Sequence, residues 1–174
     1  MADIPDAIVL KRDRDLVGRI WEPWIRRVVL LVLTVFLALA LANVFGQKSA
    51  TVERRSPVAT LAIHAPTTLR SGLIFQARFR IVASQEIEQA TLVFSREWLE
   101  GVTLNTVEPS PIGEASNDGQ LSFDLGHIRQ GQTYDLYLQF QVNPTTFGSR
   151  TQETRLFDGK TLLLTHARDV TIFP

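Results

Sequence analysis

The stretch TYDLYLQFQV, Thr133 to Val142, decides the fold of the larger part of the chain. Its even-numbered positions are apolar or aromatic, and its odd-numbered positions are mostly polar. A period of two is typical of a β-strand with one buried face. The stretch LIFQARFRIV, Leu73 to Val82, alternates in the same way. We therefore expect two long strands that each line one side of a hydrophobic core.

Six further segments carry weaker versions of this pattern, separated by Gly, Pro and Asn signals. The final two are joined by Phe157 to Lys160, where the Asp-Gly pair suits a tight hairpin turn. Because no helical period interrupts the strands, residues 58–174 predict an all-β fold, an antiparallel immunoglobulin-like sandwich of seven to eight strands. The six segments are Thr60–His64, Gln89–Phe94, Val102–Val107, Leu121–Leu125, Thr151–Phe157 and Thr161–Phe173.

Two stretches of this region are expected to lack strands. Residues 47–57 are interpreted as a linker, and Glu108 to Gly119 as a surface loop longer than a minimal sandwich needs. Within that loop, Asn117-Asp118-Gly119 is typical of a turn. With Asp124 it offers oxygen ligands for calcium, but the alternating acidic pattern of a calcium loop is missing. We expect a turn here rather than a metal site.

The segment GQLSFDLGHIRQGQTYDLYLQFQV, Gly119 to Val142, resembles bacterial surface repeats, including cell-adhesion-related domains. In those repeats a strand ending in Leu-Gly leads through a glycine turn into a long alternating strand. The segment IHAPTTLRSGLIFQARFRIVA, Ile63 to Ala83, is similar to their opening. The two segments hold 45 of the 117 residues of the domain, and many immunoglobulin-like sandwiches would match the motif. The resemblance implies an immunoglobulin-like fold in the cell envelope and no shared catalytic residues.

A second kind of sequence precedes the β region. Val28 to Phe45 is a run of eighteen residues without a formal charge. A bilayer core of about 30 Å needs about 20 helical residues, so residues 28–46 predict one transmembrane helix. Residues 11–27 are rich in Lys and Arg, which places the N-terminus in the cytoplasm and the β region outside the membrane. The protein is thus predicted as single-pass, in a cytoplasmic or inner membrane.

The segment before this run, residues 1–27, is expected to be cytoplasmic. Leu16, Val17 and Ile20 begin an apolar stripe with helical spacing, which predicts a short amphipathic helix along the inner leaflet. Pro23 is expected to mark the turn into the span. Four residues are assigned to the membrane interface, where indole rings and cationic side chains meet the headgroups: Trp21, Trp24, Arg26 and Arg27.

A cleaved signal peptide is the alternative to an anchor. Ala38-Leu39-Ala40 and Ala40-Leu41-Ala42 are small-x-small triplets that signal peptidase could accept, with cleavage after Ala40 or Ala42. The charged region ahead of the run is long, and Val44 and Phe45 extend the apolar stretch beyond both triplets. These features favour the anchor.

The composition narrows the chemistry. The chain has no cysteine, its net charge is zero, and no basic stripe is present, so nucleic acid is not an expected partner. The three histidines lack ligand spacing, and no phosphate loop or nucleophile elbow occurs. Glu86 with Glu88, or Glu97 with Glu100, could be imagined as a glycosidase pair, but such carboxylates are common on solvated strands. No cofactor and no metal are expected.

One aromatic pair offers a binding alternative. Trp98 and the nearby Phe94 could form a platform for a sugar or a peptide, although a sandwich commonly buries one tryptophan in its core. Arginine outnumbers lysine fifteen to three, which we associate with a GC-rich bacterium. The sequence predicts a non-enzymatic accessory or adhesion module that contacts the lipid bilayer and another envelope protein. The alternatives are a membrane-anchored hydrolase and a cell-wall glycan-binding module.

Overall fold

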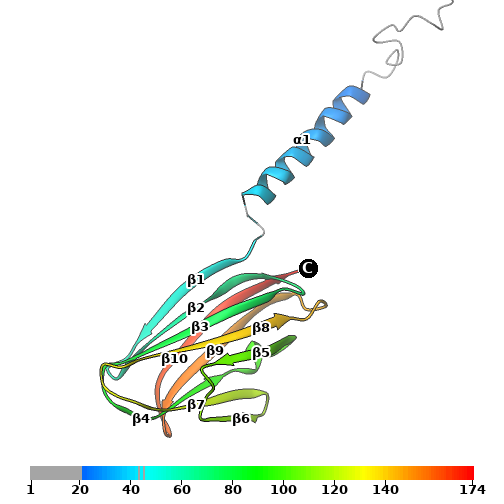
Figure 1. The fold of residues 1–174 in the computed structure, drawn as a ribbon. Helices are drawn as coiled ribbons and strands as arrows, with labels where there is room; N and C mark the ends of the chain where they lie inside the picture. Colours follow the sequence, from blue (N-terminus) through cyan, green and yellow to red (C-terminus); the bar gives the residue numbers. More distant parts are fainter. Residues whose placement is uncertain (1–20, 43, 45) are drawn as a thin grey trace, which may run out of the picture. The chain divides into compact units, whose positions relative to one another are not determined.

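The computed structural model describes residues 21–42, 44 and 46–174. They fall into two compact units, Met1–Phe45 and Gly46–Pro174, which are described separately (Figure 1). The first unit is the helix α1 (Glu22–Leu41), and the second contains ten strands and a short 3-10 helix, η2 (Arg96–Trp98). The all-β character predicted for the larger part of the chain is confirmed.

Helix α1 is 20 residues long, and none of its side chains is buried. It begins at Glu22, ahead of the predicted start at residue 28, because Pro23 is tolerated in a first turn whose N–H groups have no helical acceptor. Pro23 thus lies in the first turn of the helix, and whether the chain turns there stays a prediction, because the preceding residues 1–20 are outside the described part. Thr34 donates a hydrogen bond from Oγ1 to the Leu30 carbonyl at 2.7 Å, as a hydroxyl in an apolar helix should.

Among the described residues, α1 is the one helix long and apolar enough to cross a membrane, and a signal sequence has the same properties. Both interpretations of the apolar run are thus compatible with the structure. Leu16, Val17 and Ile20, which carried the prediction of an amphipathic helix, lie outside the described residues.

The second unit is built from one sheet. Its strands run in the order β5-β8-β3-β2-β10-β9-β4-β7-β6, and β1 pairs with β2 beside this path. Their bounds are β1 (Lys48–Arg55), β2 (Ala59–Arg70), β3 (Ile74–Ala83), β4 (Ile87–Phe94), β5 (Val102–Glu108), β6 (Gly113–Asn117), β7 (Gln120–Ile128), β8 (Thr133–Val142), β9 (Gly148–Asp158) and β10 (Thr161–Phe173).

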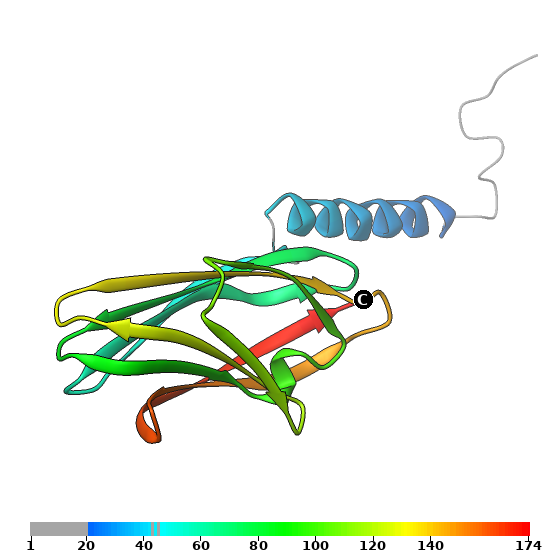
Figure 2. The same ribbon diagram turned by 60° about the horizontal axis from the view of Figure 1, so that its bottom comes forward.

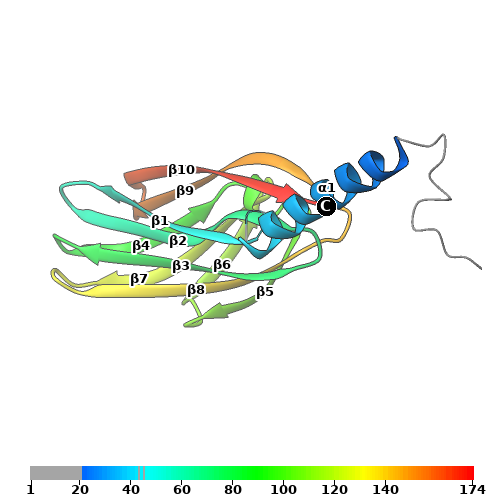
Figure 3. The ribbon, with the colours of Figure 1, turned by 90° about the horizontal axis from the view of Figure 1, so that it is seen from above.

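The sheet curls so that its two halves face each other, as Figures 2 and 3 show from two directions. Strand β2 joins β10 in a parallel pairing between Thr68–Arg70 and Thr171–Phe173, while the other pairings are antiparallel. The result is a curled, mixed, ten-stranded sheet, which differs from the predicted antiparallel sandwich of seven to eight strands. The period of a sequence indicates which face of a strand is buried, but it does not indicate which strands pair. The parallel pairing of β2 with β10 could therefore not be predicted from the sequence.

Two segments predicted to lack strands contain them. The expected linker 47–57 holds β1, whose residues are nearly all exposed, so its sequence carries no buried stripe. The expected loop between Glu108 and Gly119 holds β6, which pairs with β7 and is likewise exposed. The predicted turn at Asp118 and Gly119 is confirmed, and both residues have positive φ, 50° and 77°, as a tight hairpin turn requires.

The long strands behave as their periodicity predicts. Strand β8 covers the quoted stretch Thr133 to Val142, and its apolar positions from Leu136 onward are buried. Strands β9 and β10 form the predicted hairpin through Gly159 and Lys160, with φ 54° at Gly159. An aromatic cluster fills the interior between the two halves of the sheet, with ring centroids 5.0 to 5.8 Å apart. Its members are Phe79, Phe94, Trp98, Phe123 and Phe140.

Candidate functional site

The outer face of β1, β2, β3, β8 and β5 carries a polar row that crosses all five strands. Backbone register places Thr51 opposite His64, His64 opposite Arg78, Arg78 opposite Tyr137, and Tyr137 opposite Glu108. Alternation along each strand directs this row away from the core, because the intervening residues are the apolar ones. None of the five side chains is buried.

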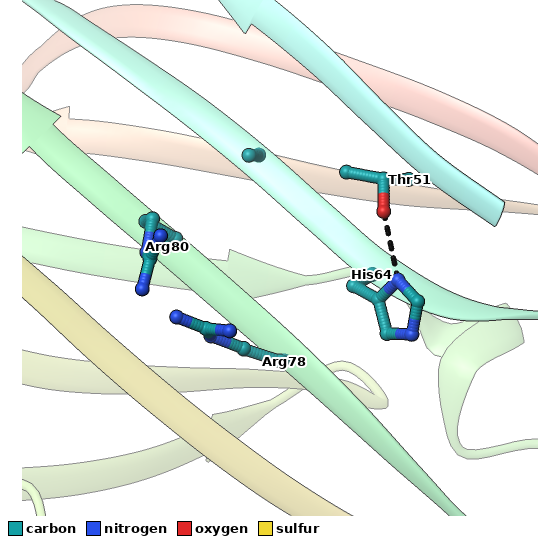
Figure 4. A pocket seen from close by; sticks show the side chains of 5 residues that line it. Thr51, His64, Arg78 and Arg80 are labelled. Atoms are coloured by element: carbon teal, nitrogen blue, oxygen red, sulfur yellow. Dashed lines mark hydrogen bonds between the residues drawn. The ribbon is translucent and has the colours of Figure 1, made fainter. Parts of the chain in front are cut away.

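A hollow of about 310 Å³ lies in this face, lined by Thr51, Ala62, His64, Arg78 and Arg80 (Figure 4). Ala62 stands opposite Arg80 on β3 and opposite Glu53 on β1. Its methyl group is much shorter than the side chains around it, and this difference in length leaves a depression in the sheet surface. We call this feature the Ala62 hollow.

Two guanidinium groups at the Ala62 hollow share one carboxylate. Arg78 donates to Asp135 from Nε at 3.0 Å and from Nη2 at 3.3 Å. Arg80 donates to the same carboxylate from Nε at 2.9 Å and from Nη2 at 3.1 Å. Two cations facing one anion leave a local excess of one positive charge.

The surroundings hold these groups in place while leaving them in contact with solvent. The Arg78 guanidinium lies 5.5 Å from the centre of the Tyr137 ring, a cation–π arrangement. The hydrogen bond to Asp135 raises the pKa of Arg78 above its ordinary value. The side chains of Arg78 and Arg80 are 33% and 46% exposed. On the other wall, the Thr51 hydroxyl lies 2.7 Å from Nδ1 of His64.

The Ala62 hollow is suited to binding. A volume of about 310 Å³ is at the lower end for small-ligand sites, so the space fits a side chain or a small ion. The groups around it are hydrogen-bond donors with positive charge, which is the arrangement that receives an anion. Sequence reasoning missed this hollow, because it depends on the register of three strands and on one small residue among long ones.

The proposed aromatic platform does not face solvent. Trp98 is 0% exposed and Phe94 is 1% exposed, and their rings meet edge to face at 5.8 Å inside the core. A ligand cannot stack on either ring in this structure, so the pair belongs to the core, the alternative weighed for Trp98. The placement of Trp98 follows from the short 3-10 helix η2 (Arg96–Trp98). This helix comes directly after β4 and directs Trp98 inward.

A polar strip lies inside the same core, on β9 and β10. Thr154 pairs with His166 and Gln152 pairs with Arg168 across the two strands, and all four side chains are buried. Neither ring nitrogen of His166 has a hydrogen-bond partner. Burial, followed by the positive charges of Arg54 and Arg168, lowers the pKa of His166. Strand alternation from Leu164 to Ile172 was the available signal that these polar residues point inward.

The residues assigned to the membrane interface lie at the start of α1. Trp21 is 79% exposed and Trp24 is 61% exposed, and the Arg27 guanidinium lies 5.4 Å from the centre of the Trp24 ring. Arg26 and Arg27 are also exposed. A role at a lipid surface stays a prediction for these four residues.

Two of the carboxylates considered for catalysis, Glu86 and Glu97, have hydrogen-bond partners in the structure. Oε1 of Glu86 accepts a hydrogen bond from Nε2 of His127 at 2.7 Å. A hydrogen bond from Ser95 lowers the pKa of Glu97, which is the opposite of what a general acid near neutral pH requires. No group of three His, Asp or Glu side chains suited to a metal ion occurs within the described part of the chain.

Comparison with known proteins assigns no family. No protein-family model matches the chain, and no curated protein matches it. Among solved structures, a non-cellulosomal cohesin from Archaeoglobus fulgidus is 14% identical, covers 63% of this chain and 88% of its own, and has a TM-score of 0.40. A CARDB domain from Pyrococcus furiosus, solved with di-metal ions, is 12% identical, with coverages of 71% and 94% and a TM-score of 0.40.

A third solved structure is comparable. The sulfur carrier protein SoxY from Chlorobium limicola is 13% identical, covers 79% of this chain and 96% of its own, and has a TM-score of 0.39. Identities and TM-scores this low carry no argument about function. The resemblance to bacterial surface repeats is accordingly not tied to a particular repeat family.

Proposed function

We propose that this chain is a single-pass membrane protein that displays its β domain outside a bacterial cytoplasmic membrane and binds another envelope protein there. One observation carries the proposal. A 20-residue apolar helix without a buried side chain stands directly before a β domain whose outer face bears an open, charged hollow. The helix exposes more apolar surface than water favours, and a bilayer would cover it.

The charge distribution supports the proposed orientation. Lys and Arg are concentrated ahead of α1, which is the side that stays in the cytoplasm under the positive-inside rule. Trp21 and Trp24 at the start of the helix suit the headgroup region on that side. The β domain would then be extracytoplasmic. A role in adhesion or assembly suits an immunoglobulin-like domain on the outer side of the membrane.

A binding role is proposed in preference to an enzymatic one. The Ala62 hollow is lined by two guanidinium groups and by the exposed Thr51–His64 pair, whose hydroxyl oxygen and Nδ1 lie 2.7 Å apart, and the positive charge of the arginines is suited to holding an anion. The core of the domain is filled by aromatic side chains, which leaves the surface as the place for recognition. The alternative functions are a membrane-anchored hydrolase and a glycan-binding module, and the experiments below distinguish them from the proposed binding role.

The membrane topology can be tested with single cysteines, because the natural chain has none. Ala2→Cys reports on the N-terminus, and Lys160→Cys reports on the exposed β9–β10 turn. In right-side-out vesicles, a membrane-impermeant maleimide should label Lys160→Cys and leave Ala2→Cys unlabelled, with the reverse in inverted vesicles. An intact mass of the membrane-extracted chain that begins after Ala40 or Ala42 would show a cleaved signal peptide and overturn the anchor.

The binding role can be tested on the intact chain in native membranes. A photo-crosslinking residue is placed on the outer face of β3, at the exposed Gln76, and at Lys160 as a second site. A specific crosslinked protein recovered from either position supports the role. If both positions return no protein while purified cell-wall fragments bind the chain, the glycan-binding alternative replaces it.

A further inference from the structure

We propose that the Ala62 hollow receives one carboxylate from an acidic segment of the partner protein, with Arg78 and Arg80 as the recognition residues. This inference rests on the proposed function, since it names the chemistry of the surface by which the partner is bound. No acidic or basic binding motif in the sequence pointed to these two arginines.

Asp135 shows that the site already accommodates a carboxylate. Its two oxygens accept four hydrogen bonds from Arg78 and Arg80, at distances from 2.9 to 3.3 Å. A guanidinium has five N–H donors, and Asp135 engages Nε and Nη2 of each arginine. The four bonds to Asp135 leave Nη1 of each arginine outside this ion pair. These donors, and the excess of one positive charge, are available to a second carboxylate.

The depth of the site favours an acidic side chain. Ala62 lies opposite Arg80 and lines the hollow together with both arginines, which Figure 4 labels, and the volume of about 310 Å³ holds a group of side-chain size. Arg78 is held against the Tyr137 ring, so less side-chain freedom is lost when a ligand binds. A preorganised arginine fork recognises carboxylate geometry more selectively than a lysine would.

The charge of the whole domain argues for one carboxylate in preference to a polyanion. From Gln47 onward the chain carries twelve Lys and Arg against thirteen Asp and Glu. A surface for anionic lipid or a phosphate polymer needs several cations together, and the Ala62 hollow has two, one carboxylate already between them. Local positive charge on a nearly neutral domain suits an acidic segment of a protein.

The experiment uses the full chain in native membranes, with the photo-crosslinking residue at Gln76. Arg78→Gln and Arg80→Gln each remove a cation from the hollow and should lower the yield of crosslinked partner about tenfold. Asp135→Asn removes the carboxylate that competes for both arginines, and it should raise the yield severalfold. Arg129→Gln, which removes an exposed cation from the β7–β8 loop, is the matched control and should leave the yield unchanged.

The opposite signs separate recognition from structural support. All three hollow substitutions break the same ion-pair group, so a purely structural role would make them change the yield in the same direction. A thermal unfolding measurement of each variant checks that the domain is folded. As a direct probe, glutarate should suppress crosslinking at lower concentrations than inorganic phosphate or N-acetylglucosamine.

The possible failures are distinguishable. If crosslinks from Gln76 and Lys160 both return no partner, the proposed function fails. If a partner is recovered but Arg78→Gln and Asp135→Asn shift its yield alike or not at all, the partner role stands and the carboxylate inference is wrong. Suppression by phosphate ahead of glutarate would replace the carboxylate with a phosphate group, and crosslinks to lipid in place of protein would also overturn it.

Discussion

The guanidinium of Arg168 lies 5.3 Å from the centre of the Trp98 ring, inside the core of the β domain. Arg168 is 8% exposed, and its Nη2 donates a hydrogen bond to the Pro66 carbonyl, while its Nε has no partner. Loss of water lowers the pKa of Arg168 to about 10. The Trp98 ring and the Pro66 carbonyl thus offset part of the free energy that is needed to remove the Arg168 charge from water. Substitutions that change the charge or the volume at this position should therefore alter the stability of the domain.

We expect Arg168→Met to leave the domain folded. Its free energy of unfolding should stay the same or rise by up to about 4 kcal/mol. A buried charge costs desolvation free energy that a hydrophobic side chain of similar volume avoids. Denaturant titration of the full chain in detergent measures the change. A loss of about 2 kcal/mol or more would show that the Trp98 and Pro66 contacts outweigh desolvation.

We expect the stability of the domain to fall in acid because of His166. Its pKa is lowered in the folded state, so below its ordinary value of about 6.5 the unfolded chain binds a proton that the folded chain resists. The contribution is fully favourable above pH 6.5 and declines as pH falls, by at most about 1.4 kcal/mol per pH unit.

The measurement compares the wild type with His166→Leu between pH 7.5 and pH 4.5. As pH falls, the free energy of unfolding of the wild type should decrease more than that of His166→Leu. His127→Gln, which removes an exposed histidine from β7, is measured alongside as a second histidine variant. Parallel curves for wild type and His166→Leu would contradict the prediction.

We expect Trp98→Ala to destabilise the domain by about 3–5 kcal/mol, since it deletes a large, fully buried ring. The ring contacts Phe79, Phe94 and Phe140, so the cavity would lie at the centre of the aromatic cluster. Calorimetry on the full chain measures the loss. A stable variant that instead lost binding to wall fragments would show that Trp98 serves a ligand.

We expect Asp135→Asn to change the free energy of unfolding by no more than about 1 kcal/mol. Its ion pairs with Arg78 and Arg80 lie at the surface, where water and salt screen the attraction. Thermal unfolding at low and at high salt measures this. A larger loss that disappeared in high salt would mean that Asp135 chiefly prevents repulsion between the two arginines.

The strands with one buried face were predictable from the sequence, and the exposed ones were not. Alternation in β3 and β8 placed both strands and their inward faces, because a half-buried strand must alternate. Strands β1 and β6 are exposed on nearly every residue, so no such pattern exists in them. Only backbone pairing with β2 and β7 makes them strands.

The candidate site depended on contacts between distant parts of the chain. Arg78 and Asp135 are 57 residues apart, and Thr51 and His64 are brought together by the β1–β2 register. Trp98 illustrates the opposite case, since core burial was weighed from the sequence and the structure decided it.

The sequence by itself determined that an apolar run of helical length precedes a β domain, because hydrophobic length and a period of two are local properties of neighbouring residues. Tertiary structure decided the curl of the sheet, the parallel junction of β2 with β10, the buried Arg168 and the Ala62 hollow. Each of these depends on which strand lies beside which, and in what register. Strand pairing is settled by the packing of the whole domain, so a local pattern cannot specify it.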